Sequence, residues 1–415
     1  MKFTEKSLVT LISRVFAAII NLIAGVLLAR ALGPSGRGEY ALLLLAPSIL
    51  SSIANFGINT ANVYFIAKKK HNLRDTVINS IAFSVIFGLI FTIIFLLFFD
   101  SFYIFFKGVT PQYLILAVVI LPVLLIHMYF NSILIGRLNM LEFNIVTVVQ
   151  PFSLLALLYI FIILLQMGVK GAFISWTLSY VVPTVLMSVF LMFQIKSNKD
   201  VEVFVPYSFS KQIGLMKELL QFGVKSYIAN LASFLSYRID MLFVNLFLDV
   251  ATVGYYSISV MLAEMIWYIP NSFALILYPV VSSSDSDTAN KLTVQACKQV
   301  LLFVSLAAIL LFLFGKQIIL LLFGKNFTPS IQPLLFLLPG IIALSVDKVL
   351  SSFITGKGRP EISGYIAGTN LVVNIGLNIF LIPKFGIIGA SISSSISYSI
   401  AGVMSLIAFL RISKK

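Results

Sequence analysis

The sequence predicts an all-α membrane protein of about twelve transmembrane helices, arranged as two six-helix lobes with a central cavity between them. Three observations predict this fold class: an apolar composition, twelve long apolar runs, and a repeat that relates the two halves of the chain. Of 415 residues, 60% are hydrophobic and 11% are charged, against roughly 50% and 25% in soluble domains. A soluble globule and a disordered chain are both excluded, because so much apolar surface has no stable hydrated state.

Twelve apolar runs, bounded by charged residues, Gly and Pro, are each long enough to cross a bilayer, since ~20 residues span its hydrocarbon core. They lie near residues 8–32, 38–66, 76–99, 112–135, 143–166, 171–194, 219–247, 251–281, 293–314, 330–355, 362–382 and 386–410. The first run has no small-residue cleavage signal, so we expect it to remain as a span. Short loops use the other residues and leave no room for a large soluble domain.

The longest polar interruption, near 195–218, separates six runs from six. It mixes lysines with Phe204, Tyr207 and Phe209, which is typical of a segment at the membrane interface. We therefore expect an N-terminal lobe at 1–195, a cytoplasmic amphipathic linker at 196–218 and a C-terminal lobe at 219–415.

The distribution of Lys and Arg predicts the orientation. With both termini inside, the cytoplasmic segments hold 18 basic residues and the opposite side holds seven. Cytoplasmic loops of membrane proteins carry this excess. We therefore interpret the net charge of +14 as a topology signal rather than a sign of nucleic-acid binding, and expect a multi-pass protein of the bacterial cytoplasmic membrane.

The two halves repeat in parallel. GVKGAFISWTLSY at 168–180 aligns with GIIGASISSSISY at 386–398, which pairs Gly168 with Gly386 and Tyr180 with Tyr398. GEYALLLL at 38–45 and GYYSISVM at 254–261 align weakly at nearly the same offset. Parallel repeats are one plan of secondary transporters, with the substrate path between the repeats.

Metal and enzyme chemistry find no support in the sequence. One cysteine, Cys297, and two histidines, His71 and His127, are too few for a Cys/His zinc set. No catalytic triad order, HExxH motif, phosphate-binding loop or dinucleotide fingerprint is present. We expect neither a cofactor nor an enzyme.

Polar residues recur at helical spacing on four runs. On the seventh run they are Ser226, Asn230, Ser233, Tyr237 and Asp240; on the eighth Ser257, Met261, Glu264, Tyr268 and Asn271; on the second Ser48, Ser52, Asn55, Asn59 and Asn62; and on the first Arg14, Ala18, Asn21 and Gly25. Spacings of three and four place each set on one helix face. Such faces can simply hold helices together. Their agreement across the repeat favours a shared hydrated cavity.

Seven charged residues fall in the interior of the runs, away from their ends, where each needs a partner, water or a function. They are Arg14, Lys225, Arg238, Asp240, Glu264, Asp347 and Lys348. On a continuous helix Arg238 and Asp240 point to nearly opposite sides. Arg14 and Lys225 have a second interpretation, in which their long side chains extend to the cytoplasmic surface.

The motifs together resemble a known family. The segments LARALGPSGRGEYALLLL (28–45), LSYRIDMLFVNLFLDVATVGYYSIS (235–259), LLFGKNFTPSIQPLLFLLPG (321–340), TGKGRPEISG (355–364) and LIPKFGIIGASIS (381–393) resemble polysaccharide flippases of the Wzx and polysaccharide-transport type. Multidrug and toxin extrusion antiporters and lipid II flippases share that superfamily. The resemblance implies alternating-access export of an undecaprenyl-pyrophosphate-linked oligosaccharide, driven by an ion gradient, with a polysaccharide polymerase and chain-length machinery as partners.

The cavity residues divide into two candidate groups. For substrate binding these are Arg14, Asn21, Asn55, Lys225, Asn230, Tyr237, Arg238 and Lys348, because four bases against three acids suit a pyrophosphate while amides and hydroxyls suit sugars. For ion coupling they are Asp240, Glu264 and Asp347, because a carboxylate that alternates between wet and occluded settings can carry a proton. The alternatives are a cation antiporter, a membrane glycosyl-transfer enzyme and an architectural scaffold.

Overall fold

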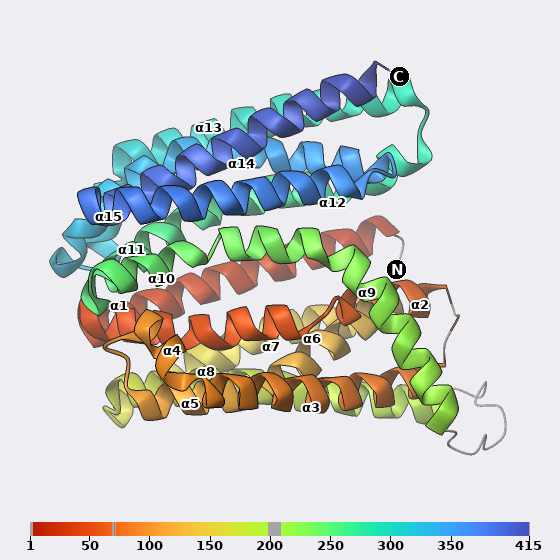
Figure 1. The fold of residues 1–415 in the computed structure, drawn as a ribbon, viewed down its shortest axis with the longest axis horizontal. Helices are drawn as coiled ribbons and strands as arrows, with labels where there is room; N and C mark the ends of the chain where they lie inside the picture. The colour runs from red at the N-terminus through yellow and green to blue at the C-terminus, as the bar shows by residue number, and fades with distance from the viewer. Residues whose placement is uncertain (1–2, 69, 71, 198–208, 415) are drawn as a thin grey trace. The chain divides into compact units, whose positions relative to one another are not determined.

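A computed structural model describes residues 3–68, 70, 72–197 and 209–414 of the chain. These residues are almost entirely helical (Figure 1). The helices of the first half are α1 (Phe3–Ala54), α2 (Ile58–Ala67), α3 (Leu73–Leu97), α4 (Phe99–Tyr103), α5 (Pro111–Val119), α6 (Leu121–Gly136), α7 (Met140–Leu158) and α8 (Gly168–Ser197). Those of the second half are α9 (Phe209–Ser236), α10 (Ile239–Phe247), α11 (Val250–Glu264), α12 (Tyr268–Ser283), α13 (Ser286–Leu322), α14 (Ile331–Gly356) and α15 (Pro360–Ser413).

Each of the twelve predicted runs lies within these helical segments. By length and composition, nine stretches of the described residues qualify as membrane spans. Two of them are long enough for two crossings each: α1 is interrupted by Gly33 (φ 65°) and α15 by Gly386 (φ 60°). Only glycine adopts such positive φ values readily. The segment formed by α9 and α10, richer in polar residues, is the twelfth. The prediction of a polytopic helical membrane protein is confirmed.

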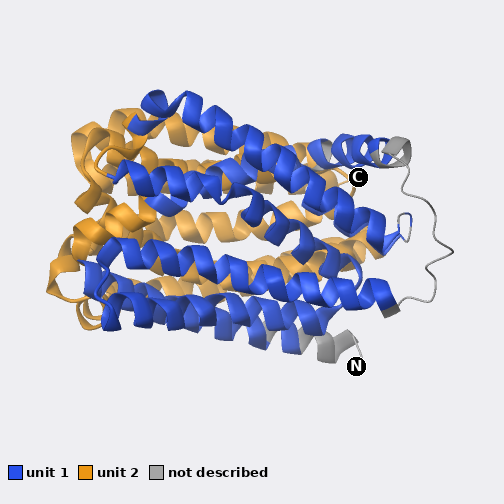
Figure 2. Ribbon diagram, turned by 90° about the horizontal axis from the view of Figure 1, so that it is seen from below, with its two compact units in different colours: residues 1–32, 43–103, 109–228 blue, residues 33–42, 104–108, 229–415 orange. Residues whose placement is uncertain are grey.

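The chain divides into two compact units (Figure 2). Unit 1 comprises residues 1–32, 43–103 and 109–228, and unit 2 comprises residues 33–42, 104–108 and 229–415. Residues 198–208 of the predicted linker lie outside the described residues, and the last part of that linker, from Phe209 onward, begins α9.

The predicted repeat has a structural counterpart at the start of α8 and at the break of α15. Gly168 and Gly386 both have left-handed φ, at 56° and 60°. In both copies the next matched glycine approaches the preceding helix, because a Cβ on Gly171 would lie 2.9 Å from the Phe161 carbonyl oxygen and one on Gly389 would lie 2.2 Å from that of Leu381. The sequence match therefore reflects a shared backbone turn.

Unit 1 has a core where α2, α3 and α6 meet the start of α9. Leu215 and Leu219 of α9 pack against Ile58, Phe65 and Tyr129. A Cβ on Gly57 would lie 2.2 Å from the Gly223 carbonyl oxygen, so these backbones are in close contact. The exposed Lys70 and Glu218 form an ion pair beside this core.

In unit 2, small residues bring α14 against the second part of α15. A Cβ on Gly340 would lie 2.4 Å from Ser395 Cα, and one on Gly402 would lie 2.9 Å from the Ala343 carbonyl oxygen. Lipid-embedded helices associate through such close packing because the surrounding lipid is as apolar as their side chains. This contact fixes α15 against α14, which carries Asp347 and Lys348 of the cluster described next.

Candidate functional site

Six of the eleven candidate residues come together in unit 2. Tyr237, Arg238 and Asp240 lie where α9 gives way to α10, Glu264 ends α11, and Asp347 and Lys348 lie on α14. We call these six residues the charged cluster. The first and last of their three segments are more than a hundred residues apart, so the fold of unit 2 brings the six residues together.

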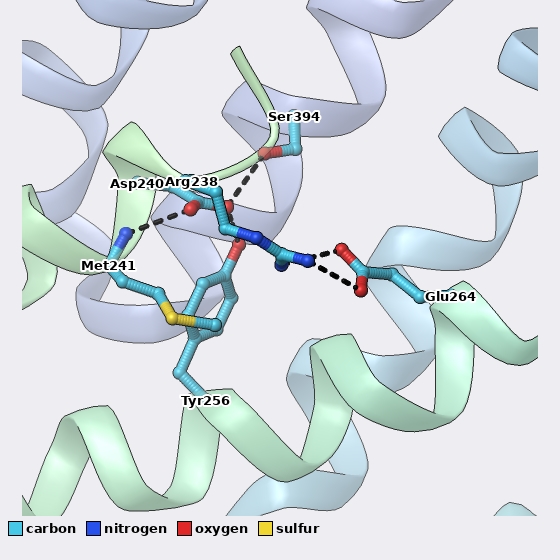
Figure 3. Close-up of polar contacts among 6 residues, drawn as sticks. All are labelled: Arg238, Asp240, Met241, Tyr256, Glu264 and Ser394. Atoms are coloured by element: carbon cyan, nitrogen blue, oxygen red, sulfur yellow. Dashed lines mark hydrogen bonds and ion pairs between the residues drawn. The ribbon is translucent and has the colours of Figure 1, made fainter. Parts of the chain in front are cut away.

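Arg238 and Glu264 form a bidentate ion pair (Figure 3). Arg238 Nη1 donates to Glu264 Oε1 at 2.8 Å and Nη2 donates to Oε2 at 3.1 Å. The two side chains are 30% and 21% exposed. Two parallel charge-assisted hydrogen bonds make this a geometrically specific contact. The guanidinium is therefore neutralised by the protein itself.

A break between α9 and α10 changes the expected geometry of Arg238 and Asp240. Arg238 has non-helical dihedrals (φ −126°, ψ −22°), so α9 ends at Ser236 and α10 begins at Ile239. The expectation that the two side chains point to opposite sides assumed a continuous helix, and the helix is broken at this point. In Figure 3 the two side chains make separate contacts: Arg238 pairs with Glu264, whereas Asp240 accepts hydrogen bonds from Tyr256, Met241 and Ser394.

Asp240 is 2% exposed and its carboxylate is the acceptor of three hydrogen bonds. Tyr256 Oη donates to it at 2.5 Å, the Met241 amide at 2.8 Å and Ser394 Oγ at 3.4 Å. A buried carboxylate is stable only with such partners. The three donors come from α11, α10 and α15, so any change in the charge of Asp240 acts on three helices together.

A network of amides continues from Asp240 along α15. Asn374 Nδ2 donates to Ser394 Oγ at 3.3 Å and to Ser397 Oγ at 3.2 Å, while Asn378 Nδ2 donates to Asn374 Oδ1 at 2.8 Å. Asn378 Oδ1 is buried and has no partner among the described residues. These residues, like Tyr256, were not in the sequence prediction. The serine-rich stretch at 391–397 is the sequence signal from which they could have been found.

Asp347 and Lys348 are neighbours on α14 with separate partners. Ser405 Oγ donates to Asp347 Oδ1 at 2.5 Å and Ser351 Oγ at 3.3 Å. Lys348 Nζ instead lies 4.9 Å from the centre of the Trp267 ring and 5.3 Å from that of Tyr237. Among the described residues no carboxylate lies within ion-pair distance of this ammonium. Its contacts are cation–π interactions, so its donors remain available to an anion.

Trp267 enters the cluster through a 3-10 turn, η3 (Met265–Trp267), between α11 and α12. In such a turn the side chains of residues three apart lie one above the other, so Trp267 lies on the same face as Glu264. Tyr268, which we expected on this face, is instead 44% exposed. The rings of Tyr237 and Trp267 are 4.8 Å apart, and that of Tyr398 is 5.8 Å from Tyr237.

A narrow hollow lies within this cluster. Its lining is Tyr237, Asp240, Val260, Ala263, Glu264, Trp267, Leu337, Ile341 and Tyr398. The space open to the centre of a water molecule is about 10 Å³, which is the room for about one water. The hollow combines three aromatic rings with two carboxylates.

The other candidate residues are not part of this cluster. Arg14, Asn21 and Asn230 are exposed and make no hydrogen bond or ion pair with described residues. Asn55 is buried, and its Nδ2 donates to Asn59 Oδ1 at 2.9 Å, a local contact at the turn between α1 and α2. The side chain of Lys225 lies outside the described residues.

The described residues offer no group of three metal-ligating His, Cys, Asp or Glu side chains. What the cluster offers is charge, hydroxyl and amide groups, and aromatic rings inside membrane-spanning helices. Ionisable residues in such positions mark substrate and ion pathways. The fold and the site therefore define a membrane transporter.

Comparison with known proteins identifies the family. The family described as polysaccharide biosynthesis protein matches residues 3–285, and that described as lipid II flippase MurJ matches residues 199–415. The chain therefore belongs to the polysaccharide biosynthesis protein family. The predicted family resemblance is confirmed.

Individual relatives are distant. The uncharacterized membrane protein MJ1375 of Methanocaldococcus jannaschii is 23% identical over 295 residues, 68% of each chain. The probable flippase AglR of Haloferax volcanii is 24% identical over 176 residues, which cover 40% of this chain and 37% of AglR. The second of these matches spans well under half of the relative.

Solved structures share the fold over nearly the whole chain. An inward-facing multidrug resistance MATE family transporter of the MOP superfamily has a TM-score of 0.79 at 18% identity, with 98% of both chains covered. A MOP superfamily transporter from Pyrococcus furiosus, described as having a binding pocket of reverse polarity, has a TM-score of 0.69 at 15% identity, with 98% of this chain and 94% of that one covered.

Proposed function

We propose that this chain flips an undecaprenyl-pyrophosphate-linked oligosaccharide repeat unit across the cytoplasmic membrane, for the assembly of O-antigen, capsule or exopolysaccharide. The observation that carries this proposal is the pair of family matches, which cover both halves of the chain and describe polysaccharide biosynthesis and lipid II flipping. The relative AglR is a probable flippase as well.

The charged cluster supports an anionic substrate through one residue above all. Lys348 has no carboxylate partner among the described residues, and its ammonium is held by two ring faces. Arg238, which we expected to share this role, is neutralised by Glu264. Lys348 is therefore the base in unit 2 that is free to attract a pyrophosphate, with Arg14 and Lys225 as further bases from unit 1.

Ion coupling is assigned first to Asp240. Its carboxylate is buried and joins α10, α11 and α15 through hydrogen bonds. Binding of a proton or another cation there removes a charge and changes all three contacts. Glu264 is committed to Arg238, and Asp347 accepts bonds from two serines; both remain secondary candidates. Transport then proceeds by alternating access of the lobes 1–195 and 219–415, with the linker 196–218 and both termini in the cytoplasm.

One observation favours a second function. Within unit 2 the cluster holds three acids and only two bases, and the rings of Tyr237 and Trp267 already cover a cation. A negative, aromatic site is also what a multidrug and toxin extrusion-type antiporter needs for organic cations. The cation antiporter is therefore the alternative, and it shares the fold.

Deletion of the gene in the host separates the two functions. Flipping predicts that intact lipid-linked repeat units accumulate on the cytoplasmic leaflet and that surface polysaccharide is lost. Complementation with the wild-type chain restores both. Unchanged surface polysaccharide combined with new sensitivity to cationic drugs would replace the flippase with the antiporter.

A further inference from the structure

Trp267 is a polar side chain in the hollow whose hydrogen-bonding group is unused. Its indole nitrogen Nε1 is buried and has no partner among the described residues. A buried donor without an acceptor is unfavourable, and the surrounding polar groups are otherwise engaged: Glu264 with Arg238, and Asp240 with Tyr256. This N–H is therefore available to donate a hydrogen bond to a bound ligand.

The ring faces beside this donor are covered by the protein itself. Lys348 Nζ lies over both Trp267 and Tyr237, whose ring centres are 4.8 Å apart. A cation held only by π faces binds more weakly than one held by a phosphate, because charge-assisted hydrogen bonds add to the Coulomb attraction. An arriving phosphate thus draws the ammonium away and uncovers two aromatic faces.

An uncovered aromatic pair with a free N–H suits one chemical group next to a phosphate. A pyranose ring presents C–H bonds on its face and hydroxyl groups at its edge. The C–H bonds carry partial positive charge and pack on the negative face of an aromatic ring. The edge hydroxyls accept a hydrogen bond from an indole N–H, and Tyr398 and Glu264 also line the hollow.

We propose that the Trp267 ring, with the Tyr237 ring tilted by 51° beside it, forms a stacking platform for the first sugar of the substrate, and that Lys348 leaves this platform to bind the adjoining phosphate. The hollow here has room for about one water, so the sugar enters in the state of the transport cycle in which the hollow is open. This inference rests on the proposed flippase function and names the part of the substrate that unit 2 recognises. Trp267 Nε1 donates to a sugar oxygen in this complex. Lys348 couples the two subsites, because its departure toward the phosphate uncovers the rings.

The two tryptophans of the chain make the platform directly observable. Trp176 is buried in unit 1, so a Trp176→Phe protein carries Trp267 as its sole indole. The purified protein in lipid nanodiscs is titrated with lipid-linked oligosaccharide extracted from host membranes and, separately, with undecaprenyl pyrophosphate. We expect undecaprenyl pyrophosphate, which draws Lys348 away from the ring, to increase acrylamide quenching of Trp267, and the oligosaccharide-bearing lipid to protect Trp267 from quenching.

Variants of Trp267 assign the sugar contact. Trp267→Leu removes the aromatic face, and we expect it to weaken binding of the lipid-linked oligosaccharide by about tenfold while binding of undecaprenyl pyrophosphate is unchanged. Trp267→Phe keeps a ring and loses the N–H, so its effect is smaller. Equal losses for both lipids, or no loss for either, would overturn the platform. If the wild-type chain binds neither lipid, the proposed function itself fails.

Discussion

Arg238 and Glu264 are joined by two hydrogen bonds of 2.8 and 3.1 Å across the break between α9 and α10 and the end of α11. This ion pair ties the two helices that carry Asp240 and its partner Tyr256. Because Arg238 is already paired, we assign the proposed anion contact in unit 2 to Lys348.

Loss of one partner of this pair destabilises the fold. Glu264→Gln leaves the guanidinium without its counter-charge, and we expect the free energy of unfolding to fall by about 2 kcal/mol. This is less than the ~3–5 kcal/mol for a fully buried pair, because both side chains are partly exposed. Equilibrium unfolding in mixed micelles measures this free energy. The double variant Arg238→Gln/Glu264→Gln recovers part of the lost stability. The control Glu361→Gln, which changes an exposed glutamate, leaves the stability unchanged. Additive effects in the double variant would show that the two residues are not coupled.

Neutralisation of Lys348 impairs transport without unfolding the protein. Lys348→Gln removes the ammonium that faces Trp267 and Tyr237, and we expect flipping to fall by about tenfold or more. Lys348→Arg keeps the charge and retains part of the activity. The matched control is Lys384→Gln, an exposed lysine on α15. Full activity of Lys348→Gln would remove this residue from the anion site.

Neutralisation of Asp240 uncouples transport from the ion gradient. Asp240→Asn keeps the shape of the side chain but cannot bind a proton, so we expect residual flipping that no longer responds when the gradient is collapsed. Tyr256→Phe removes one donor and has a smaller effect in the same direction. Asp287→Asn, on the exposed start of α13, serves as the control. If Asp240→Asn still responds to the gradient as the wild type does, the coupling residue lies elsewhere.

The contact between α14 and α15 tolerates no larger residue at Gly340. A Cβ there would lie 2.4 Å from Ser395 Cα, so Gly340→Ala forces the backbones apart and we expect it to destabilise the fold by about 1–3 kcal/mol. Gly376→Ala, where nothing lies within 4 Å, is the matched control and is neutral or slightly stabilising. The melting temperatures of the two variants are compared. A lower value for Gly340→Ala than for Gly376→Ala is expected, and equal values would contradict the close packing.

Local sequence patterns predicted the fold well because a bilayer sets the length and apolarity of each span. All twelve runs lie in helical segments, and the match of Gly168 with Gly386 marks two turns of the same left-handed geometry. Spacings of three and four likewise selected Tyr237, Asp240 and Glu264, because a regular helix converts spacing into direction.

The same reasoning failed where the helices are irregular or where partners are distant in sequence. The stripe on the eighth run predicted Tyr268, but the 3-10 turn at Met265–Trp267 places Trp267 beside Glu264 instead. The spacing of Arg238 and Asp240 likewise assumed a continuous helix, whereas the backbone is broken at Arg238. No local spacing encodes that Ser394 and Ser405 approach acids on α10 and α14, since those contacts arise only from the packing of α15.

The central claim, that this chain moves lipid-linked oligosaccharide between leaflets, is tested most directly by reconstitution. Purified protein is placed in vesicles that contain lipid-linked oligosaccharide, and the fraction that an externally added lectin can reach is followed over time with an imposed ion gradient. We predict that the wild-type chain moves the oligosaccharide to the lectin-accessible leaflet and that Lys348→Gln does so far more slowly. A rate equal to that of protein-free vesicles would contradict the account.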